Sequence, residues 1–399
     1  MEHTNGISLK VIFLDNGNWW NFFCLHADKL RPAIIKNVLK MLACQTALLG
    51  YHTYTCPTCG FQKKVYHTCK SKFCSSCGKK ATDRWMKEKF SNFPATKWQH
   101  ITFTLPSELW NFFWFNRKLI GMIPPLAAGI ILAIAEKKLA LPAIYLAIHT
   151  FGRDLKRNLH FHLTTTNGGI NIYNHNEWIK GIFYYHETIK AQWRYAIINL
   201  LREQYEAGNI AMPSNYAHIK NYKQFNKFLD TLYKKNWVVH LQNSTTDHKR
   251  NIEYLGRYMM RPPISEARIT EYKDGMVTYT YMDHYDKETK SLTVEVMTFI
   301  GYVVRHIHDD NFRSIRYYGL LANRVIGKLL PLAHKLLKSK SVIIKKVKLF
   351  WRDMIIKAFG YDPLKCIKCG TIMLLELITL PLKIALTDLH EITAHGAFE

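Results

Sequence analysis

The alternation of apolar and polar residues predicts two β-strands. Every second residue is apolar in residues 100–106 (HITFTLP) and again at the start of residues 159–169 (LHFHLTTTNGG), a period typical of strands with one buried face. In the second stretch the polar positions begin with His160, His162 and Thr164. We expect this strand to be half-buried and to end in a turn at Gly168-Gly169.

Apolar residues spaced three and four apart predict helices elsewhere in the chain. The stretch from Trp110 to His149 is apolar and is predicted to be mostly helical, with breaks near Pro124-Pro125 and Pro142. A helix capped by Asp247 is expected to end before Pro262-Pro263. Further helices are expected at residues 27–49, 188–206, 222–234 and 297–307, and further strands at 237–241 and within 267–297.

The charge of the chain indicates its class of partner. The 55 Lys and Arg residues exceed the 30 Asp and Glu residues, which gives a net charge of +25 in a chain that is 48% hydrophobic. A folded protein with such a surplus typically binds a polyanion. The apolar, uncharged stretch Leu119–Ala135 falls short of the roughly 20 residues of a transmembrane helix, and the N-terminus lacks the apolar run of a signal peptide. We therefore expect a cytoplasmic nucleic-acid-binding protein.

Six of the nine cysteines form three Cys-x-x-Cys pairs. The first two pairs, Cys56/Cys59 and Cys74/Cys77, are separated by 14 residues, and a glycine follows each. Thiolates at this spacing are typical of structural zinc sites, and without a secretion signal a metal site is favoured over disulfides. We predict that these four cysteines bind one Zn²⁺, which supplies much of the folding energy of this short segment.

Other residues of this segment have open roles. Cys69, His67 and His52 could be spare, could replace a ligand or could build a second site, and their spacing does not choose. The segment also carries lysines without an acidic residue before Asp83. These are Lys63, Lys64, Lys70, Lys72, Lys79 and Lys80. Their simplest use is contact with DNA phosphates, and the alternative is a solvated basic face.

The third pair, Cys366/Cys369, supplies half of a zinc site. His390 and His395, or a second subunit, are candidates to complete it. The alternative is two free thiols in a turn.

Two pairs of side chains could carry catalysis. His160 and His162 share one face of the predicted strand, so both imidazoles can bind one cation. Tyr254 and Tyr258 are four residues apart on the predicted helix and share one of its faces. The arginines beside them, which would bind phosphate, are Arg250, Arg257 and Arg261. Taken alone, the tyrosines are better explained as an aromatic stripe packed on the sheet.

Taken together, the two pairs describe one reaction. A metal held by the histidines would polarise a phosphodiester, and a tyrosine would attack it, leaving a 5′-phosphotyrosine and a free 3′-OH. The covalent link keeps the bond energy, so a strand can be rejoined without ATP. A second tyrosine allows a second cleavage while the first link persists.

The sequence resembles the HUH transposases of the insertion-sequence-91 type, which move by rolling-circle transposition and carry an N-terminal zinc-binding domain. The matching stretches, in the family's order and over nearly the whole chain, are GYHTYTCPTCG, CKSKFCSSCGKKATDRW, HITFTLP, TFGRDLKRNLHFHL, YLGRYMMRPPIS, IRYYGLLANR and DPLKCIKCG.

The resemblance implies that His160 and His162 bind catalytic Mg²⁺ or Mn²⁺ and that Tyr254 and Tyr258 are the nucleophiles. HUH sites commonly have a third polar ligand, for which Asp154 is favoured over Glu253. The implied fold is α+β, with an RRM-like antiparallel sheet that carries the histidines on a central strand. We expect three consecutive domains: residues 1–95 with a helix and the zinc-binding domain, residues 96–300 with the HUH nuclease, and a basic, helical region at 301–399.

Two other functions remain open at this point. A zinc-dependent DNA-binding protein without catalysis explains the charge and the cysteines but leaves the histidine and tyrosine pairs accidental. A plasmid replication initiator or relaxase shares the chemistry and differs in its DNA target. The zinc-binding N-terminus and the order of the motifs favour a transposase that acts on single-stranded or melted element ends.

Overall fold

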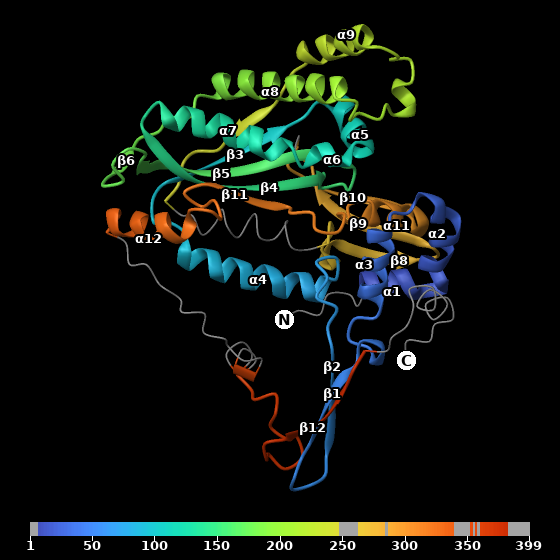
Figure 1. Ribbon diagram of the computed structural model, residues 1–399. Helices are drawn as coiled ribbons and strands as arrows, with labels where there is room; N and C mark the ends of the chain where they lie inside the picture. The colour runs from blue at the N-terminus through green and yellow to red at the C-terminus, as the bar shows by residue number, and fades with distance from the viewer. Residues whose placement is uncertain are drawn as a thin grey trace. The chain divides into compact units, whose positions relative to one another are not determined.

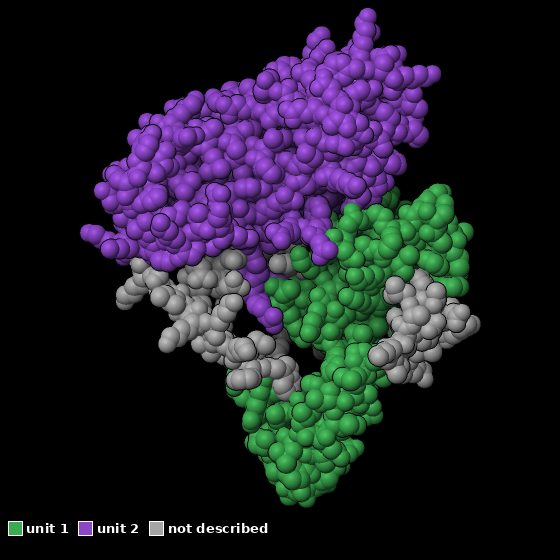
Figure 2. Space-filling model, in the orientation of Figure 1, with its two compact units in different colours: residues 1–81, 260–310, 344–399 green, residues 82–259, 311–343 purple. Residues whose placement is uncertain are grey.

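The computed structural model describes residues 7–246, 262–283, 286–338, 352–353, 356 and 360–381, with the backbone alone at 87–92 (Figure 1). The chain forms two compact units, coloured separately in Figure 2. Unit 1 comprises residues 1–81, 260–310 and 344–399, and unit 2 comprises residues 82–259 and 311–343. Each unit is thus assembled from segments far apart in the sequence, whereas the expected domains are consecutive ranges.

Unit 2 is built on an antiparallel sheet, in which the described residues form six strands in the order β11-β4-β5-β3-β7, with β6 paired to β5. The strands are β3 (Trp98–Thr104), β4 (Ala140–Phe151), β5 (Arg157–Asn171), β6 (Trp178–Lys180), β7 (Val239–Leu241) and β11 (Ile315–Gly319). The strand with the two predicted histidines, β5, is the middle strand of the five in the main order. The combination of helices with an antiparallel sheet confirms the predicted mixed class.

Helices cover one face of this sheet (Figure 1). They are α5 (Ser107–Phe115), α6 (Arg117–Ile120), α7 (Ile123–Glu136), α8 (His186–Glu206) and α9 (Tyr222–Tyr233). Phe103 and Phe161 point toward this layer and pack against Trp193 of α8. The ring centroid of Trp193 lies 4.8 Å from that of Phe103 and 5.9 Å from that of Phe161. Because side chains alternate along a strand, the residues beside Phe161 point to the opposite face.

The prediction of helix up to His149 is wrong, because residues 140–151 form strand β4. This strand is buried on both faces between β5 and β11, so its apolar residues form a continuous run without alternation. Pro142 lies at an irregularity in the pairing with β5, where a proline is tolerated within a sheet.

The predicted turn at Gly168-Gly169 is also absent, since β5 continues to Asn171 and pairs there with β4 and β6. A glycine is needed at position 169 because the backbone of Leu141 in β4 lies very close to it, and not because the chain turns there. A Cβ atom at Gly169 would lie 2.4 Å from the carbonyl carbon of Leu141, which is shorter than any normal contact.

Unit 1 joins the N-terminal helices to the segment 262–310. Leu9 N–H, at the start of α1 (Leu9–Leu14), donates to Glu266 Oε1 at 3.0 Å, and Arg31 donates to the carbonyl of Ile307 at 2.6 Å. The other elements of this part are α2 (Asn18–His26), α3 (Pro32–Leu42), α11 (Val296–Val304) and the hairpin strands β8 (Ile269–Lys273), β9 (Met276–Met282) and β10 (Thr289–Glu295).

A second sheet of unit 1 has the order β12-β1-β2, with β1 at Tyr51–Thr55, β2 at Gln62–Tyr66 and β12 at Leu374–Thr379. Two further helices complete the description: α4 (Ser75–Asn92), which leads from unit 1 into unit 2, and α12 (Ile326–Leu336) in unit 2.

One stretch of described helix, residues 117–136, is long and apolar enough to cross a membrane by length and composition alone. Half of it is buried within the protein, and its apolar residues belong to the core of unit 2.

Candidate functional site

Three histidines meet on the face of the unit 2 sheet that points away from the helical layer. His160 of β5 lies directly opposite His149 of β4, and His162 lies opposite Ala147. All of these side chains point to one face, because they alternate with the buried residues Phe161 and Ile148. Because the residue opposite His162 is the small Ala147, there is space beside His162 for the imidazole of His149.

The three imidazoles are close enough to share one ion. Their ring centroids are 4.5 Å apart for His149 and His162, 4.9 Å for His160 and His162, and 5.1 Å for His149 and His160. One ring nitrogen of each lies within 4.8 Å of the others. Nitrogen ligands bind divalent metals at about 2.0–2.2 Å, so small side-chain adjustments complete a three-nitrogen site.

Hydrogen bonds at Nδ1 of His160 and His162 determine which ring nitrogen is available to bind a metal. His160 Nδ1 lies 2.9 Å from the carbonyl oxygen of Asn158 and must donate to it, which places the lone pair on Nε2. His162 Nδ1 lies 3.0 Å from Nε2 of His100, whose Nδ1 is 3.0 Å from the Thr164 hydroxyl. If Nε2 of His162 binds a metal, the proton of the neutral ring lies on Nδ1. This N–H can then donate a hydrogen bond to Nε2 of His100.

Burial keeps this part of the site neutral. Desolvation, with the neighbouring imidazoles His149, His160 and His100 as lesser causes, lowers the pKa of His162 well below its usual range. Desolvation, with His240 as a lesser cause, lowers the pKa of His100 to about 4. Neutral imidazole is the form that binds metals, so the fold holds His162 ready for a cation at pH 7.

The structure groups His149, and not Asp154, with His160 and His162. Asp154 lies in the turn between β4 and β5, where its carboxylate accepts from Lys156 N–H at 3.1 Å and pairs with Lys156 Nζ at 3.5 Å. Glu253, the other candidate, lies outside the described residues. The sequence analysis did not identify His149 as a candidate ligand, because it predicts a helix up to this residue. His149 lies beside His160 only because residues 140–151 form a strand that pairs with β5.

The nucleophile candidates Tyr254 and Tyr258 also lie outside the described residues. The same is true of Arg250, Arg257 and Arg261. The remaining predicted DNA ligands, Lys70 and Lys72, are both exposed in unit 1.

His100 is expected to be a positioning residue for His162. Removing it as His100→Ala deletes the hydrogen-bond partner of Nδ1, and losses of such partners lower metal affinity by about 10- to 100-fold. His100→Gln restores an acceptor and should recover part of the affinity. Titration of Mn²⁺ by calorimetry, with thermal melting recorded in parallel, checks this. His240→Ala removes a nearby exposed imidazole and should leave affinity unchanged; an equal loss there would contradict the assignment.

The cysteines form two groups of four in unit 1. The first contains Cys44, Cys69, Cys74 and Cys77. Cys77 Sγ lies 3.7 Å from Cys44 Sγ and 3.6 Å from Cys69 Sγ. Hydrogen bonds from Cys69 and Cys74 lower the pKa of Cys44, which favours a thiolate in this group. Cys74 and Cys77 lie at the N-terminus of α4.

The second group contains Cys56, Cys59, Cys366 and Cys369. Cys56 Sγ lies 3.3 Å from Cys369 Sγ, and Cys59 Sγ lies 3.6 Å from Cys366 Sγ. Hydrogen bonds with the side chain and backbone of Thr371 lower the pKa of Cys369 to about 6.

This grouping corrects the predicted single site. Cys56/Cys59 and Cys74/Cys77 do not come together, because each pair finds its partners elsewhere in the chain. Cys69 joins a group, whereas His67 does not, since its Nδ1 lies 2.8 Å from the carbonyl oxygen of Leu49. For Cys366/Cys369 the completing residues are the cysteines of the same chain; His390 and His395 lie outside the described residues. Sequence reasoning missed Cys44, which has no partner at Cys-x-x-Cys spacing.

Comparisons with known proteins agree on one family. A family model described as "Transposase zinc-binding domain" matches residues 17–105, and one described as "Putative transposase" matches residues 144–328. The chain is 34% identical, over 92% of its length and 88% of the relative, to the transposase for insertion sequence element IS801 from Pseudomonas savastanoi pv. phaseolicola. It is 28% identical to "Putative transposase y4qJ" from Sinorhizobium fredii, over 70% of this chain and 72% of that one. No solved structure matches.

The ranges matched by the two family models include the first cysteine group and the three histidines. The first cysteine group lies wholly within the range matched by the zinc-binding model, and the three histidines lie within the range matched by the second model. The chain therefore belongs to the insertion-sequence-91 (IS91) family of DNA transposases.

Proposed function

We propose that this transposase nicks one DNA strand at the end of its element and transfers it through a covalent tyrosine link, as an HUH endonuclease. The observation that carries the proposal is the group of three imidazoles on neighbouring strands of one sheet face. Three neutral nitrogen ligands leave further coordination positions for water or a phosphate oxygen. Such an open site suits a catalytic ion better than a structural one.

His149, His160 and His162 would hold the divalent ion, Mg²⁺ or Mn²⁺, which when bound polarises the scissile phosphodiester. The Tyr254 phenolate oxygen forms a bond to phosphorus as the bond to the 3′ oxygen breaks. The leaving strand takes up a proton as a free 3′-OH, and the 5′-phosphate stays on the tyrosine. Tyr258 performs the later transfer. Arg250, Arg257 and Arg261 bind neighbouring phosphates.

The proposed substrate is single-stranded or melted DNA at the element's end. Attack in line with the leaving oxygen requires access to one phosphodiester, which an unpaired strand gives. Lys70 and Lys72, exposed beside the first cysteine group, suit contacts with the phosphate backbone. The first cysteine group would hold a structural Zn²⁺.

A covalent-adduct assay tests this function. Purified protein is mixed with a labelled single-stranded oligonucleotide of the element's end, with Mn²⁺ or with EDTA, and separated on a denaturing gel. We expect a protein–DNA adduct with Mn²⁺ alone, a loss of adduct in Tyr254→Phe/Tyr258→Phe, and a larger loss in Tyr254→Phe than in Tyr258→Phe. Tight DNA binding without any adduct would favour the non-catalytic DNA-binding protein. Equal cleavage of paired duplex would contradict the single-strand preference.

A further inference from the structure

Two turns in the second cysteine group have the same backbone design. In each turn, the N–H of the first cysteine donates to the carbonyl oxygen of the residue five positions later. The N–H of the glycine that follows the second cysteine donates to the carbonyl oxygen of the first cysteine. The distances are 2.9 Å for Cys56 to Phe61, 3.0 Å for Gly60 to Cys56, 2.8 Å for Cys366 to Thr371 and 2.9 Å for Gly370 to Cys366. Gly60 and Gly370 adopt left-handed φ values of +69° and +77°.

The spacing of the four sulfurs is compatible with a tetrahedral metal site. Two sulfurs bound to one Zn²⁺ at about 2.3 Å are roughly 3.8 Å apart. The sulfurs of Cys56 and Cys369 lie 3.3 Å apart and those of Cys59 and Cys366 lie 3.6 Å apart, and all four sulfurs are within 4.8 Å of one another. All four cysteines are free thiols, so a disulfide does not explain their approach. Four cysteines without a further ligand are typical of a closed, structural zinc site.

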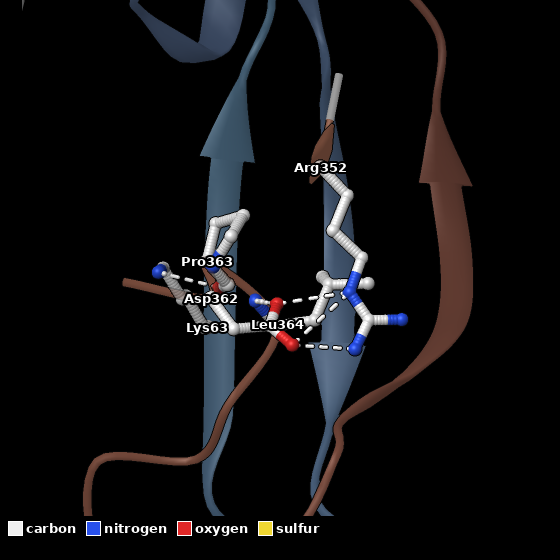
Figure 3. A network of polar contacts seen from close by, with 5 residues as sticks. All are labelled: Lys63, Arg352, Asp362, Pro363 and Leu364. Atoms are coloured by element: carbon white, nitrogen blue, oxygen red, sulfur yellow. Dashed lines mark hydrogen bonds and ion pairs between the residues drawn. The ribbon is translucent and has the colours of Figure 1, made fainter. Parts of the chain in front are cut away.

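The backbone around the group brings the two turns together independently of the sulfurs. Strand β12 pairs antiparallel with β1, from Thr55 opposite Leu374 to Tyr51 opposite Thr379. Lys63 Nζ of β2 donates to the carbonyl of Pro363 at 3.1 Å (Figure 3). The Asp362 carboxylate beside it pairs with Arg352 and accepts from Leu364 N–H at 3.0 Å, which orders the approach to Cys366 (Figure 3).

Neither family model accounts for this site. The zinc-binding model ends at residue 105 and includes only Cys56 and Cys59, and the second model ends at residue 328, before Cys366. We propose that Cys56, Cys59, Cys366 and Cys369 bind a second structural Zn²⁺, separate from the one at Cys44, Cys69, Cys74 and Cys77. This zinc clasp, defined by its four cysteines, fastens the C-terminal segment 360–381 to the hairpin β1–β2.

The clasp joins positions very far apart in the chain, since Cys59 and Cys366 are separated by 307 positions. Closing a long loop removes much conformational freedom from the unfolded chain. The apolar core there is small: among the described residues, the buried Met373 packs with Cys56 and Cys366, and Tyr54 and Phe61 are partly buried against them. Zinc is therefore expected to provide most of the stability of this contact.

Zinc content measured on the full-length protein tests the clasp. Cys366→Ser/Cys369→Ser and Cys56→Ser/Cys59→Ser should each lose one zinc per chain relative to the parent by mass spectrometry of the metal. The quadruple variant should also lose one and not two, because both pairs belong to one site. The zinc content of each variant is compared with that of the parent protein. Any zinc bound by the histidines is present in both and does not affect the difference. Cys24→Ser, an exposed cysteine outside both groups, should lose none.

Hydrogen exchange supplies a readout that does not depend on activity. In Cys56→Ser/Cys59→Ser, the amides of β12 should lose protection although their own sequence is unchanged, while those of β4 and β5 keep theirs. Cys369→His, which retains a zinc ligand, should keep both the metal and the protection. Full zinc content in Cys366→Ser/Cys369→Ser, or a loss of two zinc ions in the quadruple variant, would overturn the clasp. This test fails or succeeds independently of the adduct assay.

Discussion

His149→Ala is expected to lower the nicking rate about 100- to 1,000-fold, as His160→Ala and His162→Ala should, because each would remove one of the three nitrogens proposed to hold the catalytic ion. The rate of adduct formation under single-turnover conditions measures this. Asp154→Asn is the matched control, since Asp154 was the ligand favoured from the sequence and lies in the turn after β4. It should react at close to the parent rate.

The comparison distinguishes two assignments of the third ligand. A large loss in Asp154→Asn with little change in His149→Ala would restore Asp154 as the ligand and contradict the structural grouping. Because His149 is buried, its removal also leaves a cavity. Thermal melting of each variant separates that effect, since a folded variant without nicking points to the metal site.

Loss of zinc from the first cysteine group is expected to unfold the N-terminal part of unit 1. Zinc binding to such sites contributes about 10–16 kcal/mol in small zinc domains at pH 7, and Cys77→Ser removes a sulfur close to both Cys44 and Cys69. Hydrogen exchange should show lost protection in α1 and α3, whereas β3, β4 and β5 of unit 2 remain protected. A strong chelator should have the same effect on the parent.

The control is again Cys24→Ser, which should keep parental exchange. Unchanged protection of α3 in Cys77→Ser would contradict a structural metal in this group. Comparison with Cys366→Ser/Cys369→Ser then separates the two groups, since that variant should lose protection in β12 and keep it in α3.

Strands β3 and β5 could be inferred from the sequence because each has an alternating segment. Ile101, Phe103, Phe161 and Leu163 are all fully buried, as their pattern predicts. Strand β4 could not be inferred, because burial on both faces removes the alternation and leaves a run that also suits a helix. The error concealed His149, so the predicted metal site lacked one of its three grouped residues.

The cysteine groups show a different limit of sequence reasoning. Spacing identifies Cys-x-x-Cys pairs, but it does not say which pairs meet, since that depends on how distant segments fold together. Cys44 lies just beyond the end of α3 and reaches its group through the packing of that helix. Cys366 and Cys369 reach theirs through the pairing of β12 with β1, a contact between segments more than 300 positions apart in the sequence.

The position of the zinc clasp also has a consequence for the order of events during synthesis. Cys56 and Cys59 leave the ribosome early, yet their partner cysteines follow more than 300 positions later. Throughout translation the N-terminal half-site stays open, and it closes only once residue 369 has emerged. A chain that terminates before residue 369 cannot complete the site, so zinc bound at the proposed clasp would distinguish chains that reach this residue from shorter ones.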